Sequence, residues 1–417
     1  MTVQALTKGI HNCPCGKDHT CPIDFVEIGA GALDKLPAIC AGFRHVLLVA
    51  DGNTWKVAGE QVYSRIETAV EHAFVMENNG PVVVPNEEKI AEIEACLSAD
   101  TDLIIGIGSG VINDLCKHVS FQHNLPYYIV ATAPSMDGYA SVGAALILEG
   151  MKITLNARPP KAIIADTAIL KDAPMEMLRA GYGDIVGKYS CLNDWKLAAL
   201  IYDEYFCQAV YDLTYDTAKR VELLADGIAA RDEQAVGALM EALVTVGIAM
   251  SYVGTSRPAS GSEHHLSHFF EITGILDNTP YFSHGIDVAY AAIETAKLRE
   301  ELRTVRPCRK AFDRGYWESE IRRVYTSSAD GVIAQQDKLG WYEREDTDRI
   351  YGLWDEICAV LAEAPTASEM QAMVERVGLR YAEFEELYTA AKIADAIRWA
   401  KDLKDRYSVL WLYYMYL

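Results

Sequence analysis

Four of the ten histidines lie in one stretch, residues 261–287, which reads GSEHHLSHFFEITGILDNTPYFSHGID. On a helix, His264 and His268 are one turn apart and share a face, whereas His265 points elsewhere. His284 follows a loop and begins a new apolar segment. Imidazoles from two successive elements commonly hold a divalent metal ion, although a single histidine is more often an ordinary core or surface residue. The stretch is therefore a candidate metal site, and by itself it names neither the metal nor the reaction.

A second group of metal-binding residue types lies near the N-terminus, in the segment CPCGKDHTC, with Cys13, Cys15, His19 and Cys21. Three thiols and an imidazole this close together could form a small structural zinc site. The C-x-C spacing is tighter than that of usual zinc fingers, and a hairpin with free thiols is the alternative. The other cysteines lie in mostly apolar segments, which is typical of reduced core residues.

Length and charge limit the class of protein. A chain of 417 residues is expected to form two domains. The net charge of −21 argues against non-specific binding to nucleic acid or to an anionic membrane, but it does not exclude a small anionic substrate. We expect a cytoplasmic protein, because the N-terminus has no apolar core of signal-peptide length and no run reaches the roughly 18 apolar residues of a membrane span.

Residues 25–166 alternate short apolar runs with segments of helical spacing, which predicts an α/β nucleotide-binding domain. Strands are expected at 25–30, 44–50, near 74, and at 126–131, 152–156 and 161–165. Helices are expected at 31–40, within 55–73, and after Asn86, whose side chain would cap the helix.

The strand that begins at Asp102 leads directly into the glycine-rich sequence GIGSGVIND and then into a helix. Glycines allow close approach of a phosphate, and a helix N-terminus supplies N–H donors. The spacing differs from the GxGxxG fingerprint, so an ordinary tight turn is the alternative. The loop TAPSMDG follows the strand at 126–131, where ligands of open α/β sheets bind. The hydroxyls of Thr132, Ser135 and Ser141 could serve a cofactor there.

Strand-like runs almost vanish after Thr167, and helical spacing continues to the C-terminus. The expected division is an N-terminal cysteine-rich segment 1–24, an α/β domain 25–166 and an all-helical domain 167–417. We expect one helix at 174–179 and a second that opens at 181–184 and runs through Lys188. Thr366 begins a capping box. The C-terminal WLYYMYL is apolar enough to pack against a partner subunit or against its own core.

Four stretches together resemble the AraM-type sn-glycerol-1-phosphate dehydrogenases: GIGSGVIND, TAPSMDGYAS, GYGDIVGK, and RPASGSEHHLSH with a later SHG. This family belongs to the superfamily of glycerol dehydrogenase, iron-containing alcohol dehydrogenase and dehydroquinate synthase. The resemblance spans about residues 25–300. It implies a Rossmann-like N-terminal domain followed by an all-α domain, as in dehydroquinate synthase.

The resemblance implies roles for individual residues. Asp184, His264 and His284 resemble the metal ligands, and the doubled His264–His265 leaves that choice open by one position. Asp137 and His268 resemble catalytic residues that contact substrate, with Asp184 also near it. Asp51 is placed for the adenosine ribose, where its charge would favour NAD over NADP. The residues that resemble the NAD(P) contacts are Gly108, Ser109, Gly110, Val111, Ile112, Asn113, Asp114, Thr132, Ala133, Pro134, Ser135 and Ser141.

The implied reaction interconverts dihydroxyacetone phosphate and sn-glycerol 1-phosphate with NAD(H) or NADP(H). Hydride would be transferred at C2, and a proton would reach the new alkoxide through water or His268. Two imidazoles and a carboxylate suit zinc, iron(II) or nickel, and the resemblance favours zinc or nickel. Arg257 is the candidate for the substrate phosphate, with Arg158 and Lys161 as alternatives.

Three other readings stay open: a dehydrogenase of unphosphorylated polyols such as glycerol, a dehydroquinate synthase-like lyase that recycles NAD, and a non-enzymatic metal- or nucleotide-binding protein. We expect a small phosphorylated substrate, no nucleic-acid or membrane partner, and a homo-oligomer (a dimer or higher).

Overall fold

The computed structural model describes residues 2–77, 83–148 and 151–417. The chain divides into two compact units. The first unit comprises residues 1–182 and 223–255, and the second comprises 183–222 and 256–417. The division by compactness therefore falls after Tyr182, whereas the change from mixed structure to helix follows Asp166, where the last strand ends.

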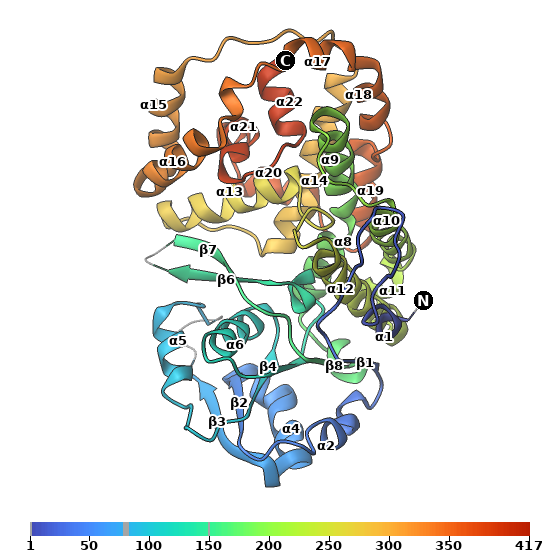
Figure 1. Ribbon diagram of the computed structural model, residues 1–417, viewed down its shortest axis with the longest axis vertical. Helices are drawn as coiled ribbons and strands as arrows, with labels where there is room; N and C mark the ends of the chain where they lie inside the picture. The colour runs from blue at the N-terminus through green and yellow to red at the C-terminus, as the bar shows by residue number, and fades with distance from the viewer. Residues whose placement is uncertain (1, 78–82, 149–150) are drawn as a thin grey trace. The chain divides into compact units, whose positions relative to one another are not determined.

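The first unit is built on a six-stranded sheet with the order β1-β8-β5-β4-β2-β3, in which every pairing is parallel (Figure 1). Its strands are β1 (Phe25–Gly29), β2 (Val46–Asp51), β3 (Val70–Met76), β4 (Leu103–Gly108), β5 (Tyr127–Ala131) and β8 (Ala162–Asp166). A separate antiparallel hairpin joins β6 (Gly143–Leu148) to β7 (Met151–Asn156). This confirms the predicted Rossmann-like α/β domain.

The strands are apolar on both faces because helices cover both faces of the sheet. In β2, Leu48 packs in a core with residues of α2 and α4, while its neighbours Leu47 and Val49 are also fully buried. Helix α6 contacts β2, β4 and β5, and α5 packs on α6. The helices of this sheet are α2 (Leu36–Ile39), α4 (Glu60–Ile66), α5 (Glu87–Glu94) and α6 (Gly110–Gln122).

The carboxyl ends of β4 and β5 lie side by side, because Gly108 pairs with Ala131 in register. The glycine-rich turn and the loop after β5 therefore start at the same edge of the sheet, as predicted. Asn86 caps α5 by accepting the N–H of Lys89 at 3.1 Å. Asp51 ends β2 and caps the short helix α3 (Gly52–Thr54).

Five further helices belong wholly or mainly to the first unit: α1 (Val3–Leu6), α7 (Thr167–Leu170), α8 (Met175–Val186), α11 (Ala225–Ala229) and α12 (Glu233–Val253). By length and composition, α12 could cross a membrane, and 78% of its apolar window is buried inside the protein. The charged residue Glu241 lies within this helix. The uninterrupted apolar run in the sequence is therefore shorter than the roughly 18 residues expected of a membrane span. The burial of α12 is that of a core helix.

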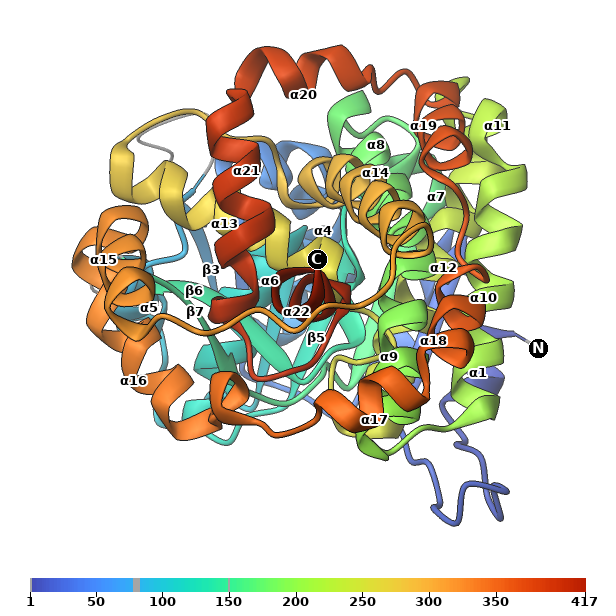
Figure 2. The same cartoon turned by 90° about the horizontal axis from the view of Figure 1, so that it is seen from above.

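The second unit is helical (Figure 2). Its helices are α9 (Lys188–Tyr202), α10 (Gln208–Leu223), α13 (Ser262–Asp277), α14 (His284–Leu302), α15 (Arg314–Tyr325), α16 (Ala329–Leu339), α17 (Thr347–Gly352), α18 (Trp354–Leu361), α19 (Ala367–Arg376), α20 (Tyr381–Leu387), α21 (Ala390–Trp399) and α22 (Val409–Tyr416). Helices α13 and α14 make an extensive contact. Helix α22 packs on α14 with Trp411 and Leu412 buried, so the apolar C-terminus contributes to the core of its own chain.

One predicted helix boundary is wrong. The sequence predicted a break at Gly181–Asp184, but α8 continues to Val186 and the new helix begins at Lys188. The glycines serve close packing instead. A Cβ on Gly181 would lie 1.9 Å from the carbonyl oxygen of Pro134, within the first unit. Glycine inside a helix usually costs stability, and here it permits contact with a neighbouring backbone.

Candidate metal centre and cofactor loop

Three side chains from three helices converge in the second unit. Asp184 comes from α8, His264 from the first turn of α13, and His284 from the first residue of α14. One donor atom from each lies within 4.8 Å of the other two. Asp184 is fully buried and His264 is 5% exposed. Two imidazole nitrogens and a carboxylate oxygen at this separation form a ligand set that a single divalent ion could bridge.

A pair of glycines brings α8 and α14 together beside these side chains. A Cβ on Gly183 would lie 2.4 Å from the carbonyl oxygen of Gly285 and 2.8 Å from the Cβ of Ala289. Gly183 precedes Asp184, and Gly285 follows His284. The missing side chain therefore permits the close helix contact that places the carboxylate beside the imidazole.

The orientation of α13 is fixed at its N-terminus by a buried polar network. The backbone N–H of Ser262 donates to Asp194 of α9 at 2.6 Å. Arg299 of α14 donates to the other oxygen of Asp194 at 3.0 Å. One carboxylate thus ties three helices together two residues before His264, where a small rotation of α13 would move the imidazole.

A carboxylate sets the orientation of the His264 ring. Its Nδ1 lies 2.6 Å from Glu263 Oε1, which also accepts the N–H of Gly261 at 2.9 Å. Burial raises the pKa of Glu263, but the bond from His264, its charge and the Gly261 N–H together lower it overall. An ionised Glu263 accepts a hydrogen bond from the Nδ1–H group and leaves the Nε2 lone pair available, 3.6 Å from Asp184 Oδ1. This is the carboxylate–histidine arrangement common behind metal ligands.

Asp184 has a cationic partner one helical turn later. The Lys188 ammonium donates to Asp184 Oδ1 at 2.6 Å and to the carbonyl oxygen of Ala259 at 2.9 Å. Burial would raise the pKa of Asp184, but Lys188 and the imidazoles of His264 and His284 lower it to about 2. The carboxylate is therefore ionised and able to accept a metal ion at any physiological pH.

The two adjacent histidines have different surroundings. His265 is fully buried, and within the described part of the chain neither of its ring nitrogens has a hydrogen-bond partner. Burial, with the charges of Arg406, Lys404 and Arg257, lowers its pKa far below the usual value. His265 is thus a neutral core residue, and the group of donor atoms contains His264 rather than His265.

His268 adds a third imidazole to the same group. Its ring centroid lies 5.5 Å from that of His284 and 6.3 Å from that of His264. Ser267 lies between these helices, with its hydroxyl 3.3 Å from His284 Nδ1. The spacing predicted that His264 and His268 share a helix face, and the structure has them on the side of α13 that meets His284.

The glycine-rich turn of the first unit has the expected strand–turn–helix form. Gly108 ends β4, Ser109 precedes α6, and Gly110 begins that helix. Two groups of predicted cofactor contacts lie at the carboxyl ends of neighbouring strands. They are the turn Gly108 to Gly110, after β4, and the loop Thr132 to Ser135, after β5. Val111 and Ile112 follow in the first turn of α6.

Three other predicted contacts take part in a network around Lys117, which is fully buried. Its ammonium donates to the carbonyl oxygens of Gly138 and Gly143 at 2.7 and 2.8 Å. It also lies 3.3 Å from Ser141 Oγ and 3.4 Å from Asp114 Oδ1, and Asp114 in turn accepts from Asn113 at 2.9 Å. These side chains therefore hold the loop after β5 against α6.

Two predicted carboxylates of the first unit have clear positions. Asp51 Oδ1 accepts the N–H groups of Asn53 and Thr54 at 2.7 and 2.8 Å, so one of its oxygens caps α3. Asp137 is 9% exposed and begins a short 3₁₀ helix, η4 (Asp137–Ala140).

Arg257 is buried, and its guanidinium bonds to groups of the protein itself. Its guanidinium forms a forked pair with Glu204, with Nε 2.5 Å from Oε1, and donates to the carbonyl oxygen of Tyr407 at 2.8 Å. Arg257 as a whole residue is 3% exposed. These partners make Arg257 a poor phosphate ligand, because an anion would have to compete with Glu204 and the Tyr407 carbonyl for the same guanidinium nitrogens. Of the two alternative phosphate ligands, Arg158 donates a hydrogen bond to Asn124 and Lys161 forms an ion pair with Asp24, both near the surface.

Sequence reasoning missed the partners that orient the candidate ligands. Lys188 follows Asp184 by four residues, one helical turn later, and Glu263 directly precedes His264, so both pairs were visible in the sequence. Lys117 follows Asp114 by three residues. The spacing of opposite charges along a helix was the available signal.

The known proteins that this chain resembles include dehydrogenases. Residues 27–174 match the family described as iron-containing alcohol dehydrogenase. A glycerol-1-phosphate dehydrogenase (NAD(P)+) of Halalkalibacterium halodurans is 36% identical over 292 residues, which is 69% of this chain and 73% of the relative. One of Methanosarcina barkeri is 36% identical over 246 residues, 58% of this chain and 68% of the relative.

The fold is shared with solved structures of low sequence identity. The iron-containing alcohol dehydrogenase of Thermococcus thioreducens has a TM-score of 0.62 at 15% identity, covering 94% of this chain and 97% of that one. At this identity the match shows the fold alone. The identity to the curated relatives carries the assignment, and this chain belongs to the glycerol-1-phosphate dehydrogenase family.

Proposed function

We propose that this protein interconverts dihydroxyacetone phosphate and sn-glycerol 1-phosphate by hydride transfer between C2 and NAD(H) or NADP(H). The activity named for its relatives supports this reaction. The observation that carries it is the convergence of Asp184, His264 and His284, with donor atoms within 4.8 Å of one another. The strand–glycine–helix turn of the first unit supports a nucleotide cofactor.

Asp184, His264 and His284 would hold one divalent metal ion. The donor set fits: one ionised carboxylate, one imidazole fixed with Nε2 available, and a second imidazole on the neighbouring helix. Nitrogen and oxygen donors suit zinc or nickel, and also iron(II). We propose zinc or nickel. When bound, such an ion supplies Lewis-acid polarisation of the C2 carbonyl.

The protein's own residues would then orient substrate and move the proton. His268 stands beside both candidate ligand imidazoles and is proposed to exchange the proton of the oxygen at C2. Glu263 and Lys188 are positioning residues, because each contacts a candidate ligand. Asp137 is proposed to contact substrate, and Asp51 to contact the ribose through the oxygen that does not cap α3.

The proposed cofactor contacts in the turn and loop are Gly108 to Asp114, Thr132 to Ser135, and Ser141. Of these residues, Asn113, Asp114 and Ser141 belong to the hydrogen-bond network around Lys117, and they would act by holding the loop after β5 in place. We further propose a cytoplasmic homo-oligomer. Arg257 is not carried forward as a phosphate ligand, because Glu204 already pairs with it.

The test is a steady-state assay of metal-depleted protein reloaded separately with zinc, nickel or iron(II). We expect oxidation of NADH or NADPH with dihydroxyacetone phosphate only after reloading. The His264→Ala variant should bind no ion at this site and stay inactive, while His265→Leu serves as the matched control. Full activity and an intact metal site in His264→Ala would refute the assignment.

The same assay separates the alternatives. Equal rates on dihydroxyacetone and its phosphate would favour a dehydrogenase of unphosphorylated polyols. Substrate turnover without any net change in nicotinamide absorbance would favour a lyase that recycles NAD.

A further inference from the structure

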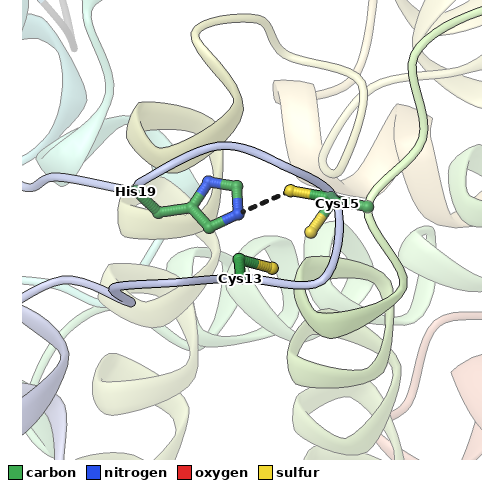
Figure 3. Close-up of side chains that lie close together, drawn as sticks. Cys13, Cys15 and His19 are labelled. Carbon is green, nitrogen blue, oxygen red and sulfur yellow. Dashed lines mark hydrogen bonds between the residues drawn. The ribbon is translucent and has the colours of Figure 1, made fainter.

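The N-terminal segment folds into a loop that is closed at its base. Ile10 and His19 form an antiparallel bridge through two backbone hydrogen bonds of 2.9 Å. Between them, the N–H of Gly16 donates to the carbonyl oxygen of Cys13 at 2.9 Å, and Gly16 has φ +83°. A tight turn of this kind brings both cysteines of the C-x-C sequence to the same side as His19 (Figure 3).

Three metal-binding side chains meet inside this loop. The sulfurs of Cys13 and Cys15 and a ring nitrogen of His19 all lie within 4.8 Å of one another. Cys15 Sγ is 3.3 Å from His19 Nε2. His19 is fully buried and Cys13 is 6% exposed. Cys21, which the sequence grouped with them, is outside this set of donor atoms among the residues that the structure describes.

The His19 ring is held in the orientation that a metal ligand requires. Its Nδ1 lies 2.8 Å from the carbonyl oxygen of Tyr252, on α12 of the same unit. A carbonyl oxygen only accepts, so Nδ1 carries the proton and Nε2 presents its lone pair toward Cys15. A backbone carbonyl behind the imidazole is a common second partner of zinc-binding histidines.

The separations also suit a small tetrahedral ion. In a zinc site with Zn–S of about 2.3 Å and Zn–N of about 2.0–2.1 Å, neighbouring sulfur and nitrogen donors are roughly 3.6 Å apart. The observed 3.3 Å is close to that value. Thiolates select soft or borderline ions such as zinc, unlike the oxygen-containing set in the second unit.

We propose that Cys13, Cys15 and His19 bind a structural zinc ion that fixes the N-terminal segment on the first unit. Other contacts also hold this segment. Val3 and Leu6 are buried, and the hydroxyl of Tyr252 donates to the carbonyl oxygen of Leu6. The ion would add to these contacts, with a fourth donor completing the tetrahedron. The proposal does not depend on the reaction that the enzyme catalyses.

Zinc K-edge X-ray absorption of the zinc-loaded full-length protein tests it. The set Asp184, His264 and His284 contains no sulfur, so sulfur scattering reports only on the N-terminal site. We expect at least two sulfur neighbours at about 2.3 Å and at least one imidazole around the N-terminal zinc ion, so that the average over two occupied sites is at least one sulfur per zinc ion. Cys15→Ser should lose sulfur scattering, and Cys21→Ser, the matched thiol control, should keep it.

A second measurement needs no variant to fold. Alkylation of the wild-type protein, read by mass spectrometry, should modify Cys13 and Cys15 only after a chelator is added, whereas the reactivity of Cys21 should not change with the chelator. A spectrum with nitrogen and oxygen neighbours alone, or a Cys13–Cys15 disulfide in the protein purified under reducing conditions with zinc, would overturn the proposal.

Discussion

The two candidate metal sites of this chain fix one histidine in the same way and differ in their other donors and in the elements that carry them. In each, a histidine is fixed through Nδ1 so that Nε2 faces the other donors. For His264 the fixing group is the Glu263 carboxylate at 2.6 Å, and for His19 it is the backbone carbonyl of Tyr252 at 2.8 Å. A carboxylate raises the basicity of the ring and a carbonyl mainly orients it.

The two sites differ in their donor atoms and in the secondary structure from which the donors project. Asp184, His264 and His284 project from three helices whose packing is fixed by glycines and by Asp194. Cys13, Cys15 and His19 share one loop of ten residues, from Ile10 to His19. We expect donors on packed helices to keep their places without an ion, and a short loop to gain order when an ion binds. We therefore expect loss of the first ion to abolish activity and loss of the second to lower stability.

Among the predictions, the largest effect on activity is expected for His264→Ala. Loss of a ligand removes the Lewis acid, and a loss of about 4 kcal/mol in transition-state stabilisation lowers kcat/KM on the order of 10³-fold. Sulfur-bound zinc should persist in this variant. His265→Leu replaces a neutral buried ring that has no hydrogen-bond partner among the described residues, and it should change kcat/KM less than about tenfold. Equal losses in both variants would erase the distinction between the two histidines.

Glu263→Gln is expected to have the next largest effect. The amide keeps the shape of the side chain but removes the charge behind His264, and such substitutions weaken metal binding about 10–100-fold. Competition with a chelator of known affinity measures this change at the helix-borne site. Affinity equal to that of the wild type would mean that Glu263 only packs against the ring.

Gly183→Ala tests whether the close contact of α8 and α14 positions Asp184. The added Cβ would meet the carbonyl oxygen of Gly285 at 2.4 Å, and overpacking of this kind costs about 1–3 kcal/mol of unfolding free energy. Metal affinity should fall together with stability. In the control, Gly331→Ala on α16, a Cβ meets no atom of the described residues within 4 Å, and the substitution should be neutral or stabilising by up to about 1 kcal/mol. A Gly183→Ala variant as stable as the control would contradict the packing argument.

The smallest effect on activity is expected for Cys15→Ser. Its Tm should fall by roughly 4 °C or more, since each 1 kcal/mol shifts the Tm of a large domain by about 2–4 °C. Its kcat/KM, measured well below the transition, should change less than about tenfold. Differential scanning calorimetry beside a kinetic assay checks both. A loss of activity as large as that of His264→Ala would show that the two clusters are not separate in function.

Much of the first unit could be predicted because its strands are short, apolar and bounded by turns. The runs ending at Ala50, Gly108 and Ala131 became β2, β4 and β5, and Asn86 caps α5 as its spacing indicated. In the second unit, Thr366 caps α19 in the same way. The helix boundary at Gly181 was mispredicted because a glycine signals a break locally. Glycine is needed at position 181 because the carbonyl of Pro134 packs against it, and Pro134 lies 47 residues earlier in the chain (181 − 134).

The sequence by itself determined the residue types of both clusters and the face shared by His264 and His268, because helical periodicity is local. Only the tertiary structure decided which neighbours those residues have. It paired Arg257 with Glu204, left His265 in the core, and separated Cys21 from the other N-terminal donors. These outcomes depend on contacts between segments far apart in the chain, and side-chain burial, partner and charge are set by such contacts.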